Sequence, residues 1–312
     1  MHFKNKCERK KLFKKYLFSV MRWFFLLALG YIVLFQLFYM ASYAIRPISE
    51  NYNYSVIWLP KTLTLENFKI AAEVMEYGKA FFRTMSIGIV SALIEVITCA
   101  VIAYGFARFQ FPERNAVFFL VVLTILIPPQ MILSPTYLNY SHLDFLGILK
   151  GLGIIAGREL RPNILDTAWT FYLPSLFGIG LQSGLFIFIY RQFFVKLPRE
   201  LEEAAWVDGS GPVHTFVSVI LPSSKVVILT VFIFSVIWHW NDYYLSTMYL
   251  GGELNLSSQL ANLAATLSVS GYSDSRNIRM AACLLFVMPM LAMYMILQRQ
   301  FIKSIDHVGI VG

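Results

Sequence analysis

The chain has 312 residues, of which 57% are hydrophobic, 16% are aromatic and only 14% are charged. Soluble domains carry about 25% charged residues, so the composition argues against a soluble enzyme. It also excludes a disordered chain, because disorder needs low hydrophobicity and a high charge content. The sequence therefore predicts an integral membrane protein that crosses the bilayer several times.

Much of the positive charge lies before the first long apolar run, in a chain whose net charge is +8. In a membrane protein such a cluster indicates a cytoplasmic tail, which we place at residues 1–22. A basic arm that binds nucleic acid is the alternative, but the apolar composition favours the tail, and we expect no nucleic-acid partner. The basic residues concerned are Lys4, Lys6, Arg9, Lys10, Lys11, Lys14, Lys15 and Arg22.

Six apolar runs, at residues 23–45, 82–106, 116–138, 168–194, 226–245 and 280–302, predict an all-α protein with six transmembrane helices. A span needs about 20 apolar residues to cross a bilayer core about 30 Å thick. The first run resembles a signal peptide but exceeds the roughly 7 to 15 residues of its apolar region, so we expect it to remain as a span. Pro128 and Pro129 are expected to break the third span, and Gly180 and Gly184 to let the fourth pack closely.

Six spans place both termini on one side of the membrane, and this side holds 16 of the 26 lysines and arginines. The positive-inside rule makes it the cytoplasm.

The chain then divides into an external loop at 46–81, a transmembrane core at 82–302 and a cytoplasmic tail at 303–312. In the external loop, Thr64 is predicted to cap a helix that has Asn67 in its first turn. The Gly-rich segment Gly147–Pro162 is predicted to be irregular.

One cytoplasmic loop, residues 196–222, differs from the rest because it reads as two short helices joined by a sharp turn. Pro198 suits the first turn of a helix, and three glutamates follow near the positive end of the helix dipole. Gly209 is placed to end this helix with a positive φ, and Pro212 to open the second one. Pro222 marks a break before the fifth span. The loop is either a rigid peg for a cytoplasmic partner or an ordinary solvated connection.

This loop resembles the EAA loop of ABC importer permeases, whose pattern is EAA-x3-G-x9-I-x-LP. The matching residues are Glu203, Ala204, Ala205, Gly209, Leu221 and Pro222, with Val219 in place of the usual Ile and Asp208 as in sugar permeases. The resemblance implies that the loop docks in a groove of a separate ATPase. By this resemblance, Glu203 and Asp208 would orient the contact with the ATPase. The two alanines would let the ATPase approach closely, and Gly209 would form the turn.

Other segments extend the resemblance to the maltose-type carbohydrate branch over nearly the whole chain. They are Trp58-Leu59-Pro60 with Leu63–Phe68, Tyr104–Phe109, Arg191–Phe194, Trp240-Asn241-Asp242 and Gln298–Phe301. Two features depart from that branch. Thr84-Met85-Ser86 stands where Asn-Ser is usual, and the loop Leu149–Asn163 is longer than in typical members. Because this loop could contact a partner, the identity of the solute does not carry over.

The resemblance implies a type I ABC importer permease fold and three kinds of protein partner. These are a second related permease that shares the translocation path, an ATPase dimer, and an external solute-binding protein; the lipid bilayer surrounds the permeases. The chain contains no GxxxxGK[ST] phosphate loop. We therefore expect ATP and Mg²⁺ to bind to the ATPase, and this chain to hold no catalytic site, cofactor or metal.

Polar residues inside the predicted spans are candidates for the solute pathway, because ionisable groups in a bilayer are costly and face the protein interior. Glu95 either contacts the pathway or is a hydrogen-bonded structural carboxyl. An aromatic residue beside an amide and a carboxylate suits a sugar, although aromatic residues at a span end also form interfacial belts. The candidates are Glu95, Tyr137, Asn139, Trp240, Asn241 and Asp242.

Three other functions remain open at this point. The same machinery could carry a non-sugar solute. An ion-coupled secondary transporter or channel would need no ATPase, but it leaves the EAA spacing unexplained. A membrane-embedded enzyme such as a glycosyltransferase would need convergent acids or a metal site, and the sequence suggests neither.

Overall fold

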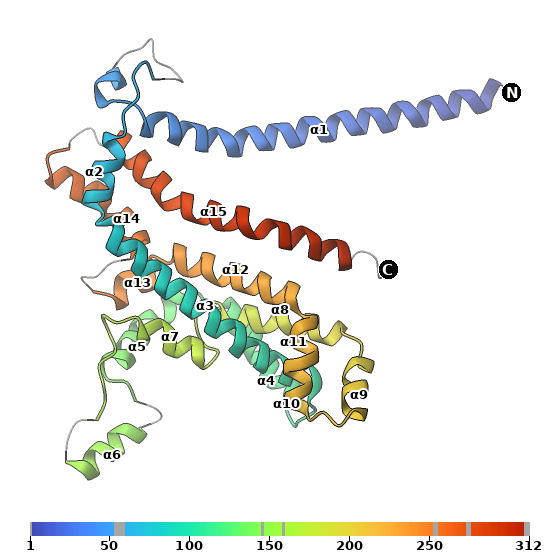
Figure 1. Cartoon of the computed structure of the whole chain (residues 1–312), viewed down its shortest axis with the longest axis vertical. Coiled ribbons are helices and arrows are strands. Elements are labelled where there is room, and N and C mark those ends of the chain that lie inside the picture. Colours follow the sequence, from blue (N-terminus) through green and yellow to red (C-terminus); the bar gives the residue numbers. More distant parts are fainter. Residues whose placement is uncertain are drawn as a thin grey trace. The chain divides into compact units, whose positions relative to one another are not determined.

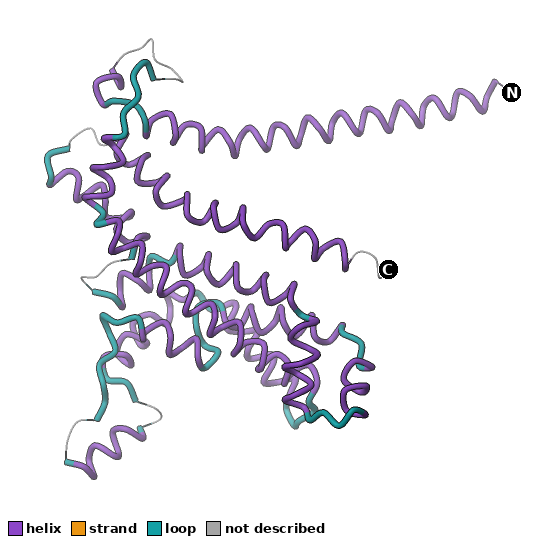
Figure 2. Tube along the Cα trace, in the orientation of Figure 1, coloured by secondary structure: helices purple, strands orange, loops and turns teal. Residues whose placement is uncertain are grey.

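The computed structural model describes residues 2–52, 60–144, 147–157, 160–251, 255–272 and 276–308, and these residues form helices and connecting loops without strands (Figures 1 and 2). Trp58 and Leu59 of the predicted external motif lie outside the described residues, as do residues 309–312 of the predicted tail. The chain divides into two compact units, Met1–Val74 with Ala264–Val287 and Met75–Leu263 with Met288–Gly312.

The first unit is held together by buried side-chain amides at the end of its long first helix, α1 (His2–Ala44). Asn67 Nδ2 donates to the carbonyl oxygens of Ala44 and Arg46, both at 2.8 Å. Asn277 Nδ2, from the start of α15 (Arg276–Val308), donates to the same Arg46 oxygen at 2.6 Å. These bonds satisfy a buried carbonyl group and fix the turn after α1 against two other helices.

The predicted helix in the external loop is present as α2 (Glu66–Val74), after the 3₁₀ helix η1 (Ile48–Tyr52). It begins one residue later than a Thr64 cap implies, but the Thr64 hydroxyl oxygen still accepts from the Glu66 N–H at 3.1 Å.

The second unit is built around α3 (Tyr77–Arg108), which packs against α7 (Trp169–Leu176), α8 (Ser183–Lys196) and α12 (Lys225–Asn241) (Figure 1). Its core combines small residues of α3 with aromatic residues of α8. Small side chains let two helix backbones approach closely, and the aromatic rings fill the space between them. The buried residues concerned are Cys99, Ala100, Ala103, Phe186, Tyr190 and Phe194.

Three helical stretches of the described chain are long and apolar enough to cross a bilayer, namely Lys14–Ala44, Tyr77–Arg108 and Arg276–Gln298. They correspond to the first, second and sixth predicted spans. Two sharply bent helix pairs raise the number to as many as five if each pair is counted as one span. The pair α4 (Arg114–Leu126) and α5 (Pro129–Ser141) bends by 102°, as expected for a third span broken at its prolines. The pair Pro212–Ser223 and Lys225–Asn241 bends by 79°.

The prediction of one continuous fourth span, 168–194, is wrong, because this region forms two helices, α7 and α8, separated by residues 177–182. Pro174 removes a backbone donor inside α7. Gly178 and Gln182 then take the left-handed conformation, with φ of 71° and 62°. Gly180 and Gly184 are therefore not on one helix face, since Gly180 lies in the break.

The prediction that Gly147–Pro162 is irregular is also wrong in part, because it contains the helix α6 (Ile148–Ala156). Gly147 and Gly157 flank this helix with φ of 83° and 64°. Glycines with positive φ are common helix stops, so here the glycines delimit a helix instead of preventing one. Two further helices, α13 (Tyr244–Tyr249) and α14 (Leu256–Val269), follow α12.

We expect Gly184→Ala to destabilise the second unit. An added Cβ would collide with the Thr124 hydroxyl and lie 3.1 Å from the Val121 carbonyl oxygen, both on α4. Overpacking of this kind costs about 1–3 kcal/mol. The matched control is Gly105→Ala on α3, where nothing lies within 4 Å of the new Cβ. Thermal unfolding in detergent should show a lower midpoint for Gly184→Ala alone; equal midpoints would contradict the close contact.

Candidate functional site

The predicted coupling loop contains a helix with an acidic first turn, α9 (Glu200–Val207). Arg199 is its N-cap, so the helix begins two residues later than a first-turn Pro198 implies. The acidic residues of its first turn are Glu200, Glu202 and Glu203. Negative charge at this end is stabilised by the helix dipole.

Gly209 ends α9 in the left-handed conformation, with φ of 85°, as predicted. The Gly209 N–H donates to the Trp206 carbonyl oxygen at 3.0 Å, and the Ser210 N–H donates to that of Ala205 at 2.9 Å. This pair of bonds is the Schellman motif, which satisfies two of the helix's last carbonyl groups. The turn is therefore fixed by backbone geometry that a side chain at position 209 would strain.

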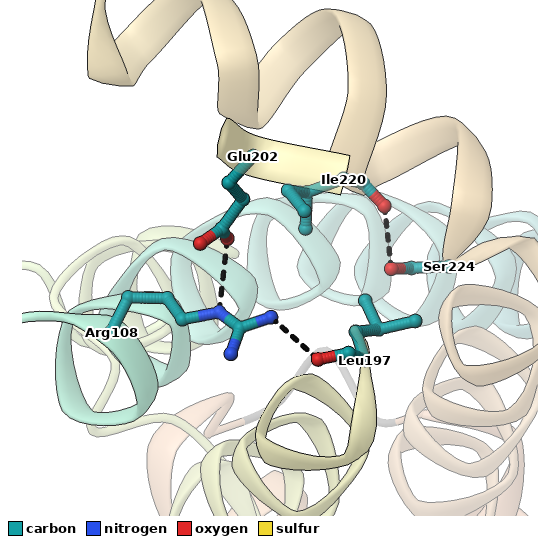
Figure 3. Close-up of polar contacts among 5 residues, drawn as sticks. All are labelled: Arg108, Leu197, Glu202, Ile220 and Ser224. Carbon is teal, nitrogen blue, oxygen red and sulfur yellow. Dashed lines mark hydrogen bonds and ion pairs between the residues drawn. The ribbon is translucent and has the colours of Figure 1, made fainter. Parts of the chain in front are cut away.

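The chain then continues toward α12 (Lys225–Asn241) through a helical segment that changes form twice. It runs through α10 (Pro212–Thr215), a π-helical turn η2 (Phe216–Ile220) and α11 (Leu221–Ser223), and then bends into α12. Ser224 stabilises the bend, because its hydroxyl donates to the Ile220 carbonyl oxygen at 2.6 Å (Figure 3). The break predicted at Pro222 is thus confirmed two residues further on.

A buried ion pair connects α9 to the end of α3 (Figure 3). Arg108 Nε donates to Glu202 Oε1 at 2.9 Å, and Arg108 Nη2 donates to the Leu197 carbonyl oxygen at 2.9 Å. The two side chains are only 7% and 4% exposed. One guanidinium group therefore binds both the start of the coupling loop and its first helix. The pairing was not predictable from the sequence, because the two residues are 94 positions apart and belong to different elements.

This pair determines which face of α9 is available to a partner. Glu202 and Ala205 lie on one side of the helix and are buried, whereas Glu203, Ala204 and Asp208 are exposed. Ala205 is therefore turned inward, with 8% of its surface exposed, and does not lie on the outer docking surface expected for it. Leu221 is half-buried against the core of the unit, and Pro222 is exposed.

The second feature of this unit is a pocket of about 490 Å³ between two helix breaks. One wall comes from the break between α4 and α5 at Pro128 and Pro129, and the other from the break between α7 and α8. Irregular backbone at membrane depth is tolerated where it lines a cavity or is buried in protein. The pocket is mainly apolar, and its polar side chains include Thr124, Thr136, Thr170, Gln182 and His239.

The residues of α5 that line the pocket differ from those predicted. Ile132, Thr136 and Tyr140 contribute to the wall, whereas Tyr137 is packed against a neighbouring core cluster and Asn139 is exposed. The lining residues are spaced four apart, which places them on one face of a helix. This spacing was the signal in the sequence that could have identified them.

The three residues predicted as pathway candidates at the end of α12 lie in different environments. Trp240 is buried edge-to-face against Phe81, with ring centroids 6.0 Å apart. Asn241 is exposed, and its side-chain amide donates to the Ile237 carbonyl oxygen at 2.8 Å. Asp242 Oδ2 accepts from the Ser246 N–H and hydroxyl, both at 2.7 Å, and so caps α13. The residue that reaches the pocket is their neighbour His239.

Glu95 is fully buried and links three helices. Its Oε2 accepts from the Ser235 hydroxyl of α12 at 2.6 Å, and its Oε1 accepts from the Ser175 hydroxyl of α7 at 3.1 Å. A Cβ at Gly180 would collide with Oε1, so the glycine permits the close approach of the broken segment. Glu95 lies behind the pocket wall, where it positions the serines.

The sequence matches a known family of membrane proteins. The family described as "Binding-protein-dependent transport system inner membrane component" matches residues 96–307, which is more than half of the chain. This chain belongs to that family. It is therefore an inner-membrane permease component of a binding-protein-dependent transport system, as the loop at 196–222 and its flanking motifs implied.

Several known proteins are similar to this permease. The sn-glycerol-3-phosphate transport system permease protein UgpE of Yersinia enterocolitica is 28% identical over 229 residues, which cover 73% of each chain. Protein LplC of Bacillus subtilis is 27% identical over 298 residues, or 92% of each chain. The osmoprotective compounds uptake permease protein GgtD of Synechocystis is 28% identical over 258 residues, covering 81% of this permease and 78% of GgtD.

The permease also shares its fold with a solved structure. A chain of a bacterial ABC transporter involved in the import of the acidic polysaccharide alginate superposes with a TM-score of 0.67. The sequence identity is 20%, and the match covers 91% of this permease and 96% of that chain. The all-α permease fold expected from the sequence is thus confirmed. The predicted count of six spans is not confirmed, because the described residues contain three to five candidate spans by length and composition.

We expect Arg108→Met to detach α9 from α3, because it leaves Glu202 buried without a partner. Breaking a buried pair in this way costs about 3–5 kcal/mol. Trypsin should then cleave faster after Arg199, which is exposed in the loop beside α9. The double variant Arg108→Met with Glu202→Leu should recover much of the lost stability, because no unpaired charge remains.

The control is Lys79→Met, which breaks the solvent-exposed pair between Lys79 and Glu76. Exposed pairs contribute little, so its unfolding midpoint and cleavage rate should match those of the unmodified permease. If Arg108→Met behaved like Lys79→Met, the pair would not hold the coupling loop.

Proposed function

We propose that this permease is one of two transmembrane subunits of an ATP-driven ABC importer for a hydroxylated, carbohydrate-type solute. The observation that carries the proposal is the coupling loop, in which a rigid helix is anchored to α3 and presents Glu203 and Ala204 outward. Two relatives support the solute class by name. One transports sn-glycerol 3-phosphate, and the other takes part in the import of alginate, a polysaccharide.

Coupling follows from the way in which α9 is held. An ATPase that grips the exposed face of α9 would move this helix when its two halves close. Because Arg108 joins α9 to α3, the displacement would pass directly into the helix that packs against α7, α8 and α12. Those helices line or support the pocket between the helix breaks. Closure of the ATPase would thereby change how the solute reaches this pocket.

The complete importer would contain further subunits, and the permease would be oriented with both termini in the cytoplasm. A second, related permease would complete the translocation path, and an external binding protein would deliver the solute. ATP and Mg²⁺ would bind to the ATPase dimer. A small pocket beside the ion pair, lined by Arg199, Glu203 and Trp206 among others, offers charged and aromatic groups to that dimer.

We expect Gly209→Val to uncouple ATP hydrolysis from uptake while membrane insertion is preserved. Valine is strained at a φ of 85°, so the Schellman turn and the angle of α9 would be lost. Gly211→Ala is the matched control, because Gly211 has an ordinary φ of −77° and open space at its Cβ. Coupled uptake by Gly209→Val at the normal rate would contradict the proposal.

The proposal as a whole is tested by purifying the complex through this permease and measuring uptake in proteoliposomes. We expect an ATPase to co-purify, and ATP to drive the uptake of at least one labelled carbohydrate when the binding protein is present. A co-purifying ATPase that transports only non-sugar solutes would overturn the solute class. Uptake driven by an ion gradient, without any ATPase, would favour a secondary transporter.

A further inference from the structure

The pocket between the helix breaks is lined in part by hydrogen-bond acceptors, and one of them is the buried side chain of His239. This residue is 2% exposed and lies on α12, with the ring of Phe171 at a centroid distance of 6.2 Å. On its other side, a Cβ at Gly88 would lie 3.7 Å from the His239 Cβ. The imidazole is therefore held in one place between α3 and α7, where it forms part of the pocket wall.

The hydrogen bond of Nδ1 defines what the other ring nitrogen can do. Nδ1 lies 2.9 Å from the Ser235 carbonyl oxygen, which can only accept, so Nδ1 carries the hydrogen. In the neutral imidazole Nε2 then presents a lone pair and can only accept. Nε2 is buried and has no hydrogen-bond partner in the part of the chain that the structure describes. Buried acceptors without a partner are uncommon, and this one belongs to a residue that lines the pocket.

The position of His239 is supported from behind by Glu95. Ser235, one turn earlier on α12, donates its hydroxyl to Glu95 Oε2 at 2.6 Å. Glu95 in turn holds Ser175 of α7 at 3.1 Å. The imidazole is therefore oriented by a hydrogen-bonded network that crosses three helices, which is typical of a prearranged binding group.

Three threonines of the pocket wall can also act as hydrogen-bond acceptors, as His239 Nε2 can. Thr124, Thr136 and Thr170 each donate their hydroxyl hydrogen to a backbone carbonyl oxygen of their own segment, at 2.7, 2.6 and 2.8 Å. Each hydroxyl oxygen therefore keeps only lone pairs for a further partner. These acceptors favour a solute that brings its own hydrogen-bond donors.

The remaining wall suits the apolar faces of such a solute. The rings of Phe171, Tyr140 and Tyr249 line the pocket together with aliphatic side chains. The volume of about 490 Å³ is in the range of small-molecule sites. A neutral sugar or polyol combines hydroxyl donors with apolar C–H faces, and so matches both kinds of wall.

We propose that this pocket is a solute subsite within this permease, in which His239 Nε2 accepts a hydrogen bond from a hydroxyl group of a neutral polyol or sugar. This inference rests on the proposed function, and it names the chemistry of the solute and the residue that recognises it. Thr136 contributes a second acceptor from the face of α5 that lines the pocket.

The test is equilibrium binding to the complete complex in lipid nanodiscs, without ATP or binding protein. The labelled probes are maltotriose and sorbitol as neutral polyols, sn-glycerol 3-phosphate as an anion, and glycine betaine as a solute without hydroxyl groups. We expect saturable binding of at least one neutral probe. Binding of only the anion, only betaine or no probe would overturn the proposal.

Variants then identify the contact. His239→Phe keeps the ring but removes the acceptor, so the affinity for the neutral probe should fall about tenfold, the effect of one lost hydrogen bond. His239→Gln retains an amide oxygen and should bind more tightly than His239→Phe. The control is His142→Phe, at an exposed histidine outside the pocket, which should not change binding.

Thr136→Val keeps the shape of the side chain while removing its oxygen, and it should weaken binding as well, even if His239→Phe fails to fold. Unchanged affinity in both variants would overturn the subsite. Because binding is measured without ATP, its failure is distinguishable from failure of the proposed function. An importer that couples ATP hydrolysis to sugar uptake but whose affinity is insensitive to both substitutions would retain the function and lose the subsite.

Discussion

The coupling loop depends on one buried ion pair, between Arg108 at the end of α3 and Glu202 on α9. A short helix such as α9 is not stable in isolation, because helices shorter than about 12–15 residues are marginal in water. Arg108 supplies the missing support by binding the Glu202 carboxylate and the Leu197 carbonyl oxygen together. The turn at Gly209 then directs the chain back to the membrane, so the exposed face of α9 has a defined orientation toward a partner.

The helix breaks have a corresponding structural role at the pocket. Prolines and left-handed residues interrupt the third and fourth predicted spans, and the two breaks lie on opposite walls of one pocket. Glu95 stabilises this arrangement from behind, because it binds the serines of α7 and α12 and leaves room only for a glycine at position 180. A regular helix bundle would fill this space with side chains. The breaks therefore create the pocket, and the buried carboxyl keeps its wall in place.

Features that rest on local backbone chemistry were predictable from the sequence, and features that rest on long-range packing were not. Gly209 alone predicts a turn, and Pro128 alone predicts a helix break. The partner of Glu202 is 94 residues away, and no pattern joins the two. Similarly, the sequence pointed to Trp240, but His239 lines the pocket. Adjacent residues on a helix point about 100° apart, so only the rotation of the packed helix decides which one faces a cavity.

The most direct test of the account is the distance between α9 and α3 during the transport cycle. Nitroxide labels at Val207 and Val101, which are 88% and 52% exposed, would be introduced into a variant whose three native cysteines are replaced. Pulsed electron paramagnetic resonance would compare the resting complex with the complex trapped by vanadate. The account predicts one narrow distance that is the same in both states, because the ion pair makes the two helices move together. A distance that changes on trapping would contradict it.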